Sequence, residues 1–80
     1  MTREQLEAWA VRHDWKQDTF GHYHKGEMRL KMQKRSVRYE RGWHTTATDY
    51  SKSEKRWTLR WSGFYSQLSL DGDDKLVPPK

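Results

Sequence analysis

Basic residues alternate with apolar ones at several points in the chain, and this spacing is the clearest sign of a binding surface. Arg29, Lys31, Arg38 and Arg60 each stand between two apolar residues. Because strand residues two apart share a face, we expect these four to project from the solvent side of a sheet. Basic side chains neutralise phosphates, and aromatic rings stack on bases. The predicted nucleic-acid-binding residues are Arg29, Lys31, Lys34, Arg35, Arg38, Arg41, Arg60 and Trp43, with Tyr23 and Tyr65 as further stacking rings.

The positive charge is concentrated in the middle of the chain. Residues 25–60 hold 11 basic and 4 acidic side chains, whereas the whole chain has a net charge of +5. A one-sided positive field attracts polyanions, which include nucleic acids, anionic lipids and acidic protein surfaces. The same residues would also suit a polar face that keeps a small sheet soluble, so both interpretations stay open.

Three histidines are the candidates for metal or acid–base chemistry. His22 and His24 are two residues apart, and His44 would supply a third nitrogen. A zinc site needs further ligands that no residue spacing indicates, so we expect surface histidines and no metal or other cofactor. A histidine can also act as the general base of RNA cleavage. No nucleophile, phosphate loop or carboxylate pair with a recognisable spacing accompanies them, and we expect a protein that is not an enzyme.

The order of elements around these histidines resembles HicA-type RNA-cleaving toxins. The likeness rests on a helix and a strand followed by Gly21-His22-Tyr23-His24 and the basic strand Arg29-Leu30-Lys31, about half of the chain. It implies a fold like that of double-stranded-RNA-binding domains and a catalytic histidine that follows a glycine, here His22. The chain departs from the family near its end, where Trp-rich strand segments occupy the place of a closing helix.

The elements that must position these residues are one helix and several strands. Thr2 and Gln5 have the spacing of a capping box, and Leu6, Trp9, Ala10 and His13 follow at helical spacing, which predicts a helix over 3–13. The period then changes to two, which predicts strands over 19–24, 28–33, 37–41, 57–61 and 64–70. The parity of the apolar residues changes near residues 34–36, either at a hairpin or at a bulge within one long strand, and we favour the hairpin. Residues 42–55 are predicted to form a long loop.

This pattern predicts an α+β fold, with the N-terminal helix packed on a four- to five-stranded antiparallel sheet. We expect one domain over 1–74 and a frayed tail over 75–80. The predicted core residues are Leu6, Trp9, Ala10, Phe20, Met28, Leu30, Met32, Val37, Tyr39, Trp57, Leu59, Trp61, Leu68 and Leu70.

Composition limits where such a chain would act. The chain has 80 residues without cysteine, its first residues are charged, and no apolar run is long enough to span a membrane. We therefore expect a cytoplasmic protein without a membrane partner.

Three functions remain as hypotheses. The first is a non-enzymatic binding module whose basic sheet face engages nucleic acid. The second is a protein-interaction module, either an adaptor or an inhibitor of a larger assembly, because exposed tryptophan, tyrosine and arginine also dominate protein interfaces. The third is a His-dependent ribonuclease of a toxin-like kind.

Overall fold

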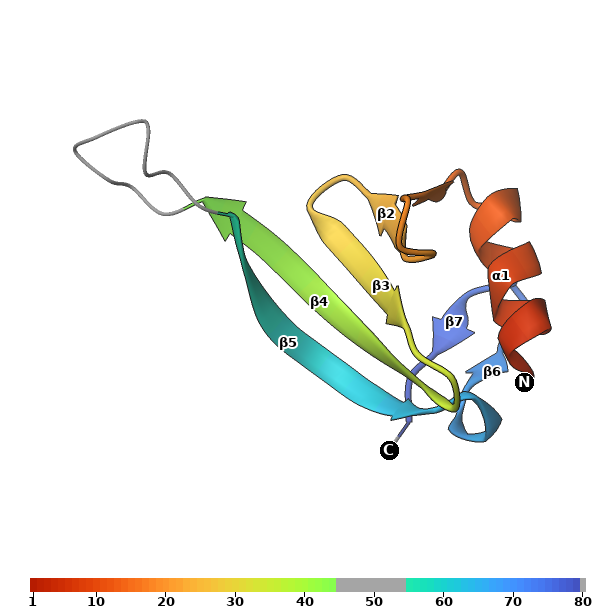
Figure 1. The fold of residues 1–80 in the computed structure, drawn as a ribbon. Helices are drawn as coiled ribbons and strands as arrows, with labels where there is room; N and C mark the ends of the chain where they lie inside the picture. The colour runs from red at the N-terminus through yellow and green to blue at the C-terminus, as the bar shows by residue number, and fades with distance from the viewer. Residues whose placement is uncertain (45–54, 80) are drawn as a thin grey trace, which may run out of the picture.

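The structure is a computed structural model, and it describes residues 1–44 and 55–79. It confirms the α+β fold, with one helix and a five-stranded antiparallel sheet in the order β1-β2-β3-β4-β5, joined by a second sheet of two strands (Figure 1). The elements are α1 (Arg3–Arg12), β1 (Lys16–Gln17), β2 (Tyr23–Lys25), β3 (Met28–Met32), β4 (Ser36–His44), β5 (Lys55–Phe64), β6 (Ser69–Leu70) and β7 (Leu76–Val77), with a 3₁₀ turn at Tyr65–Gln67. Among these residues, no helix has the length and apolar character needed to cross a membrane.

Helix α1 begins at the predicted capping box. Gln5 N donates to Thr2 Oγ1 at 3.2 Å, and Thr2 N donates to Gln5 Oε1 at 2.8 Å, so two of the free N–H groups at the helix start are satisfied. The helix ends at Arg12, and its buried residues are Leu6, Trp9 and Ala10.

The change of parity near residues 34–36 is a hairpin. Strands β3 and β4 pair in antiparallel register from Met28↔Arg41 to Met32↔Val37, and Gln33 N donates to Ser36 O at 2.9 Å to close the turn. Strand β4 then continues through 42–44, and β5 begins at Lys55, so the predicted loop over 42–55 is wrong at both ends. The remaining residues of that segment, 45–54, lie outside the described residues.

One bulge in β5 decides which side chains face the core. Tyr39 pairs with Trp61, but Glu40 pairs with Leu59, so Arg60 is an extra residue in β5. The strand therefore changes face at Arg60. Trp61 lies on the inner face of the sheet, which we define by the directly paired Tyr23, Leu30, Tyr39 and Trp61. The opposite, outer face carries the paired His24, Arg29, Glu40 and Leu59, followed by Lys31, Arg38 and Ser62.

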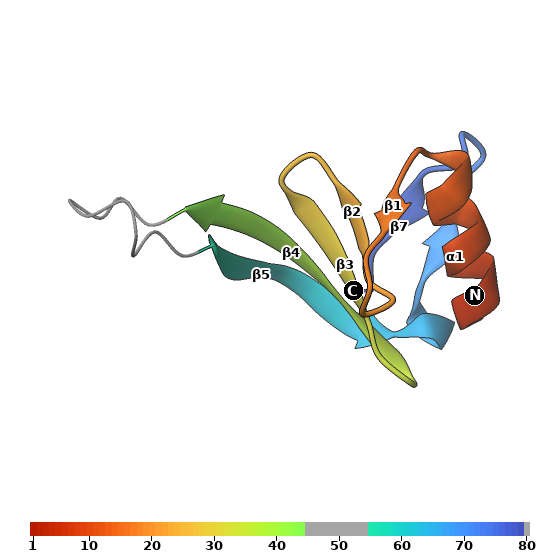
Figure 2. The same cartoon turned by 45° about the horizontal axis from the view of Figure 1, so that its top comes forward.

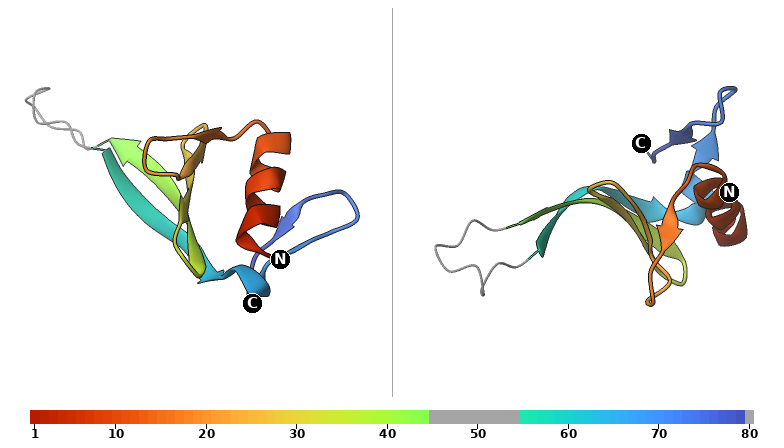
Figure 3. Two further views of the ribbon diagram at one scale, coloured as in Figure 1. Left: turned by 45° about the vertical axis from the view of Figure 1, so that its right-hand side comes forward. Right: turned by 90° about the horizontal axis from the view of Figure 1, so that it is seen from above.

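The core lies between the inner face, α1 and the C-terminal segment (Figures 2 and 3). Its buried residues are Leu6, Trp9, Ala10, Trp15, Tyr23, Leu30, Met32, Val37, Tyr65 and Leu68, and the partly buried Met28, Tyr39, Trp61 and Leu70 pack against them. Three predicted core residues are wrong. Phe20 is 82% exposed because it lies in a turn before β2, and Leu59 is 45% exposed because the bulge moves it to the outer face. Trp57 is moved to the outer face in the same way and is only half-buried.

The C-terminal segment forms a second small sheet. Strand β7 pairs with β6, and Asp71 closes the turn between them by accepting from the N–H groups of Asp73 and Lys75, each at 2.9 Å. Trp9 Nε1 donates to Asp74 O at 2.7 Å, which ties this hairpin to α1. The hairpin occupies the place where the toxin resemblance implies a closing helix. The strand predicted over 64–70 is also shorter, because the 3₁₀ turn at Tyr65–Gln67 interrupts it.

The exchange of faces in β5 can be tested with two leucines on nearby strands. Replacing Leu30 with alanine should lower the free energy of unfolding by about 2–5 kcal/mol, because Leu30 is fully buried. Replacing Leu59 with alanine should cost no more than about 1 kcal/mol, as expected for a largely exposed side chain. Urea denaturation measures both changes. Equal decreases in stability would contradict the assignment of Leu59 to the outer face.

Candidate nucleic-acid interface

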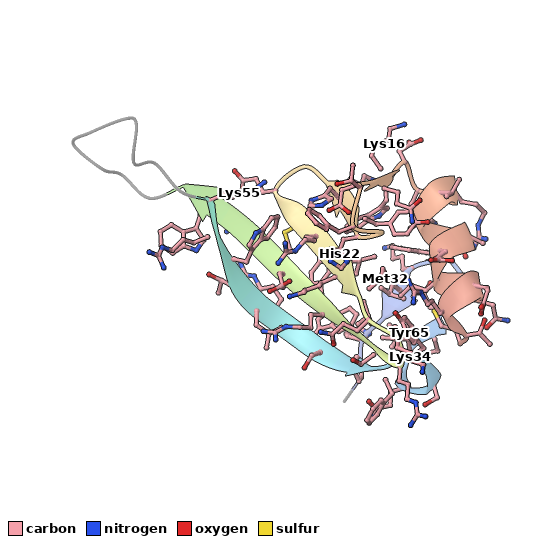
Figure 4. The ribbon with its side chains drawn as sticks, in the orientation of Figure 1. Lys16, His22, Met32, Lys34, Lys55 and Tyr65 are labelled. Carbon is pink, nitrogen blue, oxygen red and sulfur yellow. The ribbon has the colours of Figure 1, made fainter. Side chains whose placement is uncertain are left out.

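Three of the predicted nucleic-acid-binding residues lie together on the outer face. Arg29 and Lys31 project from β3, and Arg38 lies directly opposite Lys31 on β4. The exposed Lys34 and Arg35 follow in the turn between these strands. Figure 4 shows Lys34 at this turn and Lys55 at the far end of the β4–β5 hairpin. Basic residues therefore occur along the full length of the face.

The other three predicted residues lie elsewhere. Arg41 and Trp43 continue the inner-face alternation of β4, beyond the part of the sheet that α1 covers. Arg60 is the bulge residue, so its alternation with apolar neighbours does not place it beside Arg29. These three side chains line an open hollow of about 710 Å³ together with Glu27, Gly42, Lys55 and Thr58. Arg41 Nη2 forms an ion pair with Glu27 Oε2 at 3.2 Å, and Trp43 Nε1 donates to Thr58 Oγ1 at 2.9 Å.

The two tyrosines proposed as stacking rings are buried on the core side. Tyr23 packs within the core cluster, and the Tyr65 hydroxyl donates to Gln33 O. Burial raises the pKa of both phenols. Neither ring is accessible for stacking on a base.

A buried carboxylate organises the outer face. Glu40 is the one buried charged residue among those that the structure describes, and its side chain is 6% exposed. Arg29 donates to Glu40 Oε1 from Nε at 3.2 Å and from Nη2 at 2.8 Å, and the Arg29 side chain is itself only 16% exposed. Such a pair is tightly held, because breaking it would leave a buried charge uncompensated. Arg29 therefore serves mainly to neutralise Glu40.

Trp57 completes this cluster, and the sequence patterns did not reveal its position. The Arg29 guanidinium lies 3.9 Å from the centre of the Trp57 ring, and Lys55 Nζ lies 4.6 Å from it. Gly42 makes room for both side chains, because a Cβ at this position would lie 2.5 Å from Lys55 Cε and 2.9 Å from Trp57 Cζ3. The ring is thus held against β4 by two cations.

Lys31 and Arg38 are the basic side chains of this face that remain available to a ligand. Lys31 forms no side-chain ion pair or hydrogen bond within the described part of the chain. Arg38 Nε is 3.9 Å from Glu40 Oε2, too far for a hydrogen bond, and the Arg38 side chain is 43% exposed. Ser62 adjoins the pair from β5. The outer face thus presents two neighbouring cations whose charges are not fully compensated.

The histidines of this region have structural partners. His24 Nε2 lies 2.6 Å from Asp18 Oδ2, while Asp18 Oδ1 accepts from Phe20 N and His22 N at 2.9 Å. His22 Nδ1 accepts a hydrogen bond from Met32 N at 3.0 Å, which requires an unprotonated Nδ1. Burial lowers the pKa of His22, the charges of Arg29 and Lys31 lower it further, and Asp18 opposes them. The side chain of His44 lies outside the described residues.

No metal centre is evident in the described ranges, since no three His, Asp or Glu side chains there come close enough to hold an ion.

Comparison with known proteins finds no family model, no curated protein and no solved structure that matches the chain.

The half-buried His22 contributes a component of stability that depends on pH. The unfolded imidazole binds a proton near its ordinary pKa of 6.5, and the folded one binds it at lower pH. The unfolded state therefore takes up more protons below about pH 6.5, and the His22 contribution is lost as the pH falls. His22→Asn, whose side-chain oxygen can accept from Met32 N, should remove this component.

Urea denaturation of both proteins between about pH 7.5 and 5.5 measures the difference. The free energy of unfolding of the wild type should fall relative to that of His22→Asn as the medium is acidified. A constant difference across this range would show that His22 titrates alike in both states.

Proposed function

We propose that the chain is a nucleic-acid-binding module whose outer sheet face contacts the phosphate backbone. The observation that carries this proposal is the cross-strand pair of Lys31 and Arg38 on the sheet face opposite the core. The Cβ atoms of directly opposed residues are about 5 Å apart, and like charges at this spacing destabilise a sheet. A bound polyanion would convert this unfavourable pair into a binding site.

Glu40 does not remove the repulsion. Both of its hydrogen bonds to this cluster come from Arg29, and its contact with Arg38 is long. The face therefore has three arginine or lysine side chains around one carboxylate. Lys34 and Arg35 extend the positive charge past the turn. Backbone contacts of this kind position a nucleic acid without reading its sequence, so we expect little sequence selectivity.

Neutralising one basic side chain at a time tests this function. Lys31→Gln should weaken binding to unrelated oligonucleotides by a similar factor, because its ammonium group no longer neutralises a phosphate. The slope of log affinity against log salt should become shallower by about 0.7–0.9 for each phosphate that is no longer neutralised. Arg38→Gln should act similarly. Fluorescence anisotropy at several salt concentrations measures both quantities.

Lys75→Gln is the matched control, because it makes the same chemical change at an exposed residue of the C-terminal hairpin. Its slope should remain close to that of the wild type. An equal effect of Lys31→Gln and Lys75→Gln would show that net charge, and not this face, governs binding. An RNA-integrity assay on the same mixtures tests the ribonuclease hypothesis.

A protein partner is the second candidate function, and a hollow on the inner side favours it. Trp9, Trp15, Tyr39 and Trp61 line this hollow of about 310 Å³, together with His13 and the hairpin residues Asp74, Lys75 and Leu76. Within the described chain, the Tyr39 hydroxyl and Trp61 Nε1 have no hydrogen-bond partner. Aromatic pockets of this kind accept an anchoring side chain at protein interfaces. Binding through such an anchor would change little with salt, in contrast to phosphate binding.

A further inference from the structure

A hollow on the outer face lies directly beside Arg38. It has a volume of about 350 Å³, and its lining residues are Gln33, Ser36, Arg38, Ser62, Gly63 and Phe64. Ser36 and Phe64 are directly paired across β4 and β5, so both belong to the outer face as Arg38 does. The hollow therefore continues the charged surface formed by Lys31 and Arg38.

Phe64 presents its ring to solvent from a fixed backbone. The residue is 58% exposed, and no ring contact to it occurs in the described ranges. Its backbone N–H donates to Gln67 Oε1 at 2.9 Å, and the following residue, Tyr65, is buried in the core. On the preceding side, a Cβ at Gly63 would lie 2.6 Å from Pro79 Cγ, so the backbone there is closely packed. The backbone at Phe64 is thus held in place, while its ring is exposed.

The chemistry of the hollow suits an unpaired base next to a phosphate. An aromatic ring offers a stacking surface that accepts any base, and Arg38 would hold the adjoining backbone phosphate. Ser62 and Ser36 add hydroxyl groups to the wall. A volume of this size is large enough for one base with its sugar. A base inside a duplex is already stacked on both sides and cannot reach the Phe64 ring.

We infer that the ligand of the outer face is a single-stranded nucleic acid, with one unpaired base stacked on Phe64 while Arg38 and Lys31 hold the backbone. This inference rests on the proposed function and names its substrate class. Basic grooves that also carry aromatic rings are typical binding sites for single strands.

The test compares Phe64→Ala with Phe20→Ala. Phe20 is the matched control because its ring is 82% exposed but lies on the turn before β2. The probes are a labelled single strand of about 12 nucleotides and a duplex of the same length, in anisotropy titrations at low salt. Wild type should prefer the single strand. Phe64→Ala should weaken single-strand binding about 5- to 100-fold and leave duplex binding unchanged, whereas Phe20→Ala should have little effect on either.

Phe64→Tyr keeps the ring and should retain single-strand affinity, which separates the loss of stacking from a loss of folding. Two failures are distinguishable. If wild type binds neither probe at low salt, the proposed function fails. If binding depends on Lys31 but the duplex binds equally well, or Phe64→Ala has no effect, the function stands and the single-strand inference is overturned.

Discussion

The structure depends on one constraint: a single helix and a two-stranded hairpin cover only one face of a five-stranded sheet. The buried apolar side chains accordingly gather on the inner face, against α1 and the C-terminal segment. The outer face must then be compatible with water along its full length, which charged side chains achieve. In this chain those charges are mostly positive, and the consequence is a basic surface supported by a packed core on the opposite side. Fold and candidate site are thus two results of the same one-sided packing.

Two features of the outer face do not follow from the alternation of inward and outward side chains. They are the buried Glu40 and the bulge in β5. The buried carboxylate takes both hydrogen bonds from Arg29 and leaves Arg38 at 3.9 Å, so two neighbouring arginines differ in their freedom to bind a ligand. The bulge at Arg60 transfers Trp57 and Leu59 to the outer face, where the Trp57 ring packs beneath Arg29. One extra residue in one strand therefore adds Trp57 to this surface.

Much of this arrangement could be predicted from the residues alone. The capping box marked the start of α1, and strict alternation placed Arg29, Lys31 and Arg38 on one face. The bulge could not be predicted, because Trp57, Leu59 and Trp61 keep a perfect period of two although Arg60 interrupts the pairing. Arg60 and Trp57 were misplaced for this reason. Trp15 and Tyr23 enter the core through chain reversals that no periodicity marks. Phe64 was assigned to a strand, which the structure confirms, and its exposure follows from its pairing with Ser36 on the outer face.

The proposed binding of nucleic acid to the outer face can be tested by amide chemical-shift mapping. A titration of the ¹⁵N-labelled protein with a short single strand at low salt would follow every backbone N–H separately. We expect shifts that are largest at Lys31, Arg38, Ser62 and Phe64 and small along α1, whose Leu6 and Ala10 lie in the core. Shifts concentrated on α1 and the β6–β7 hairpin, with an undisturbed outer face, would contradict it.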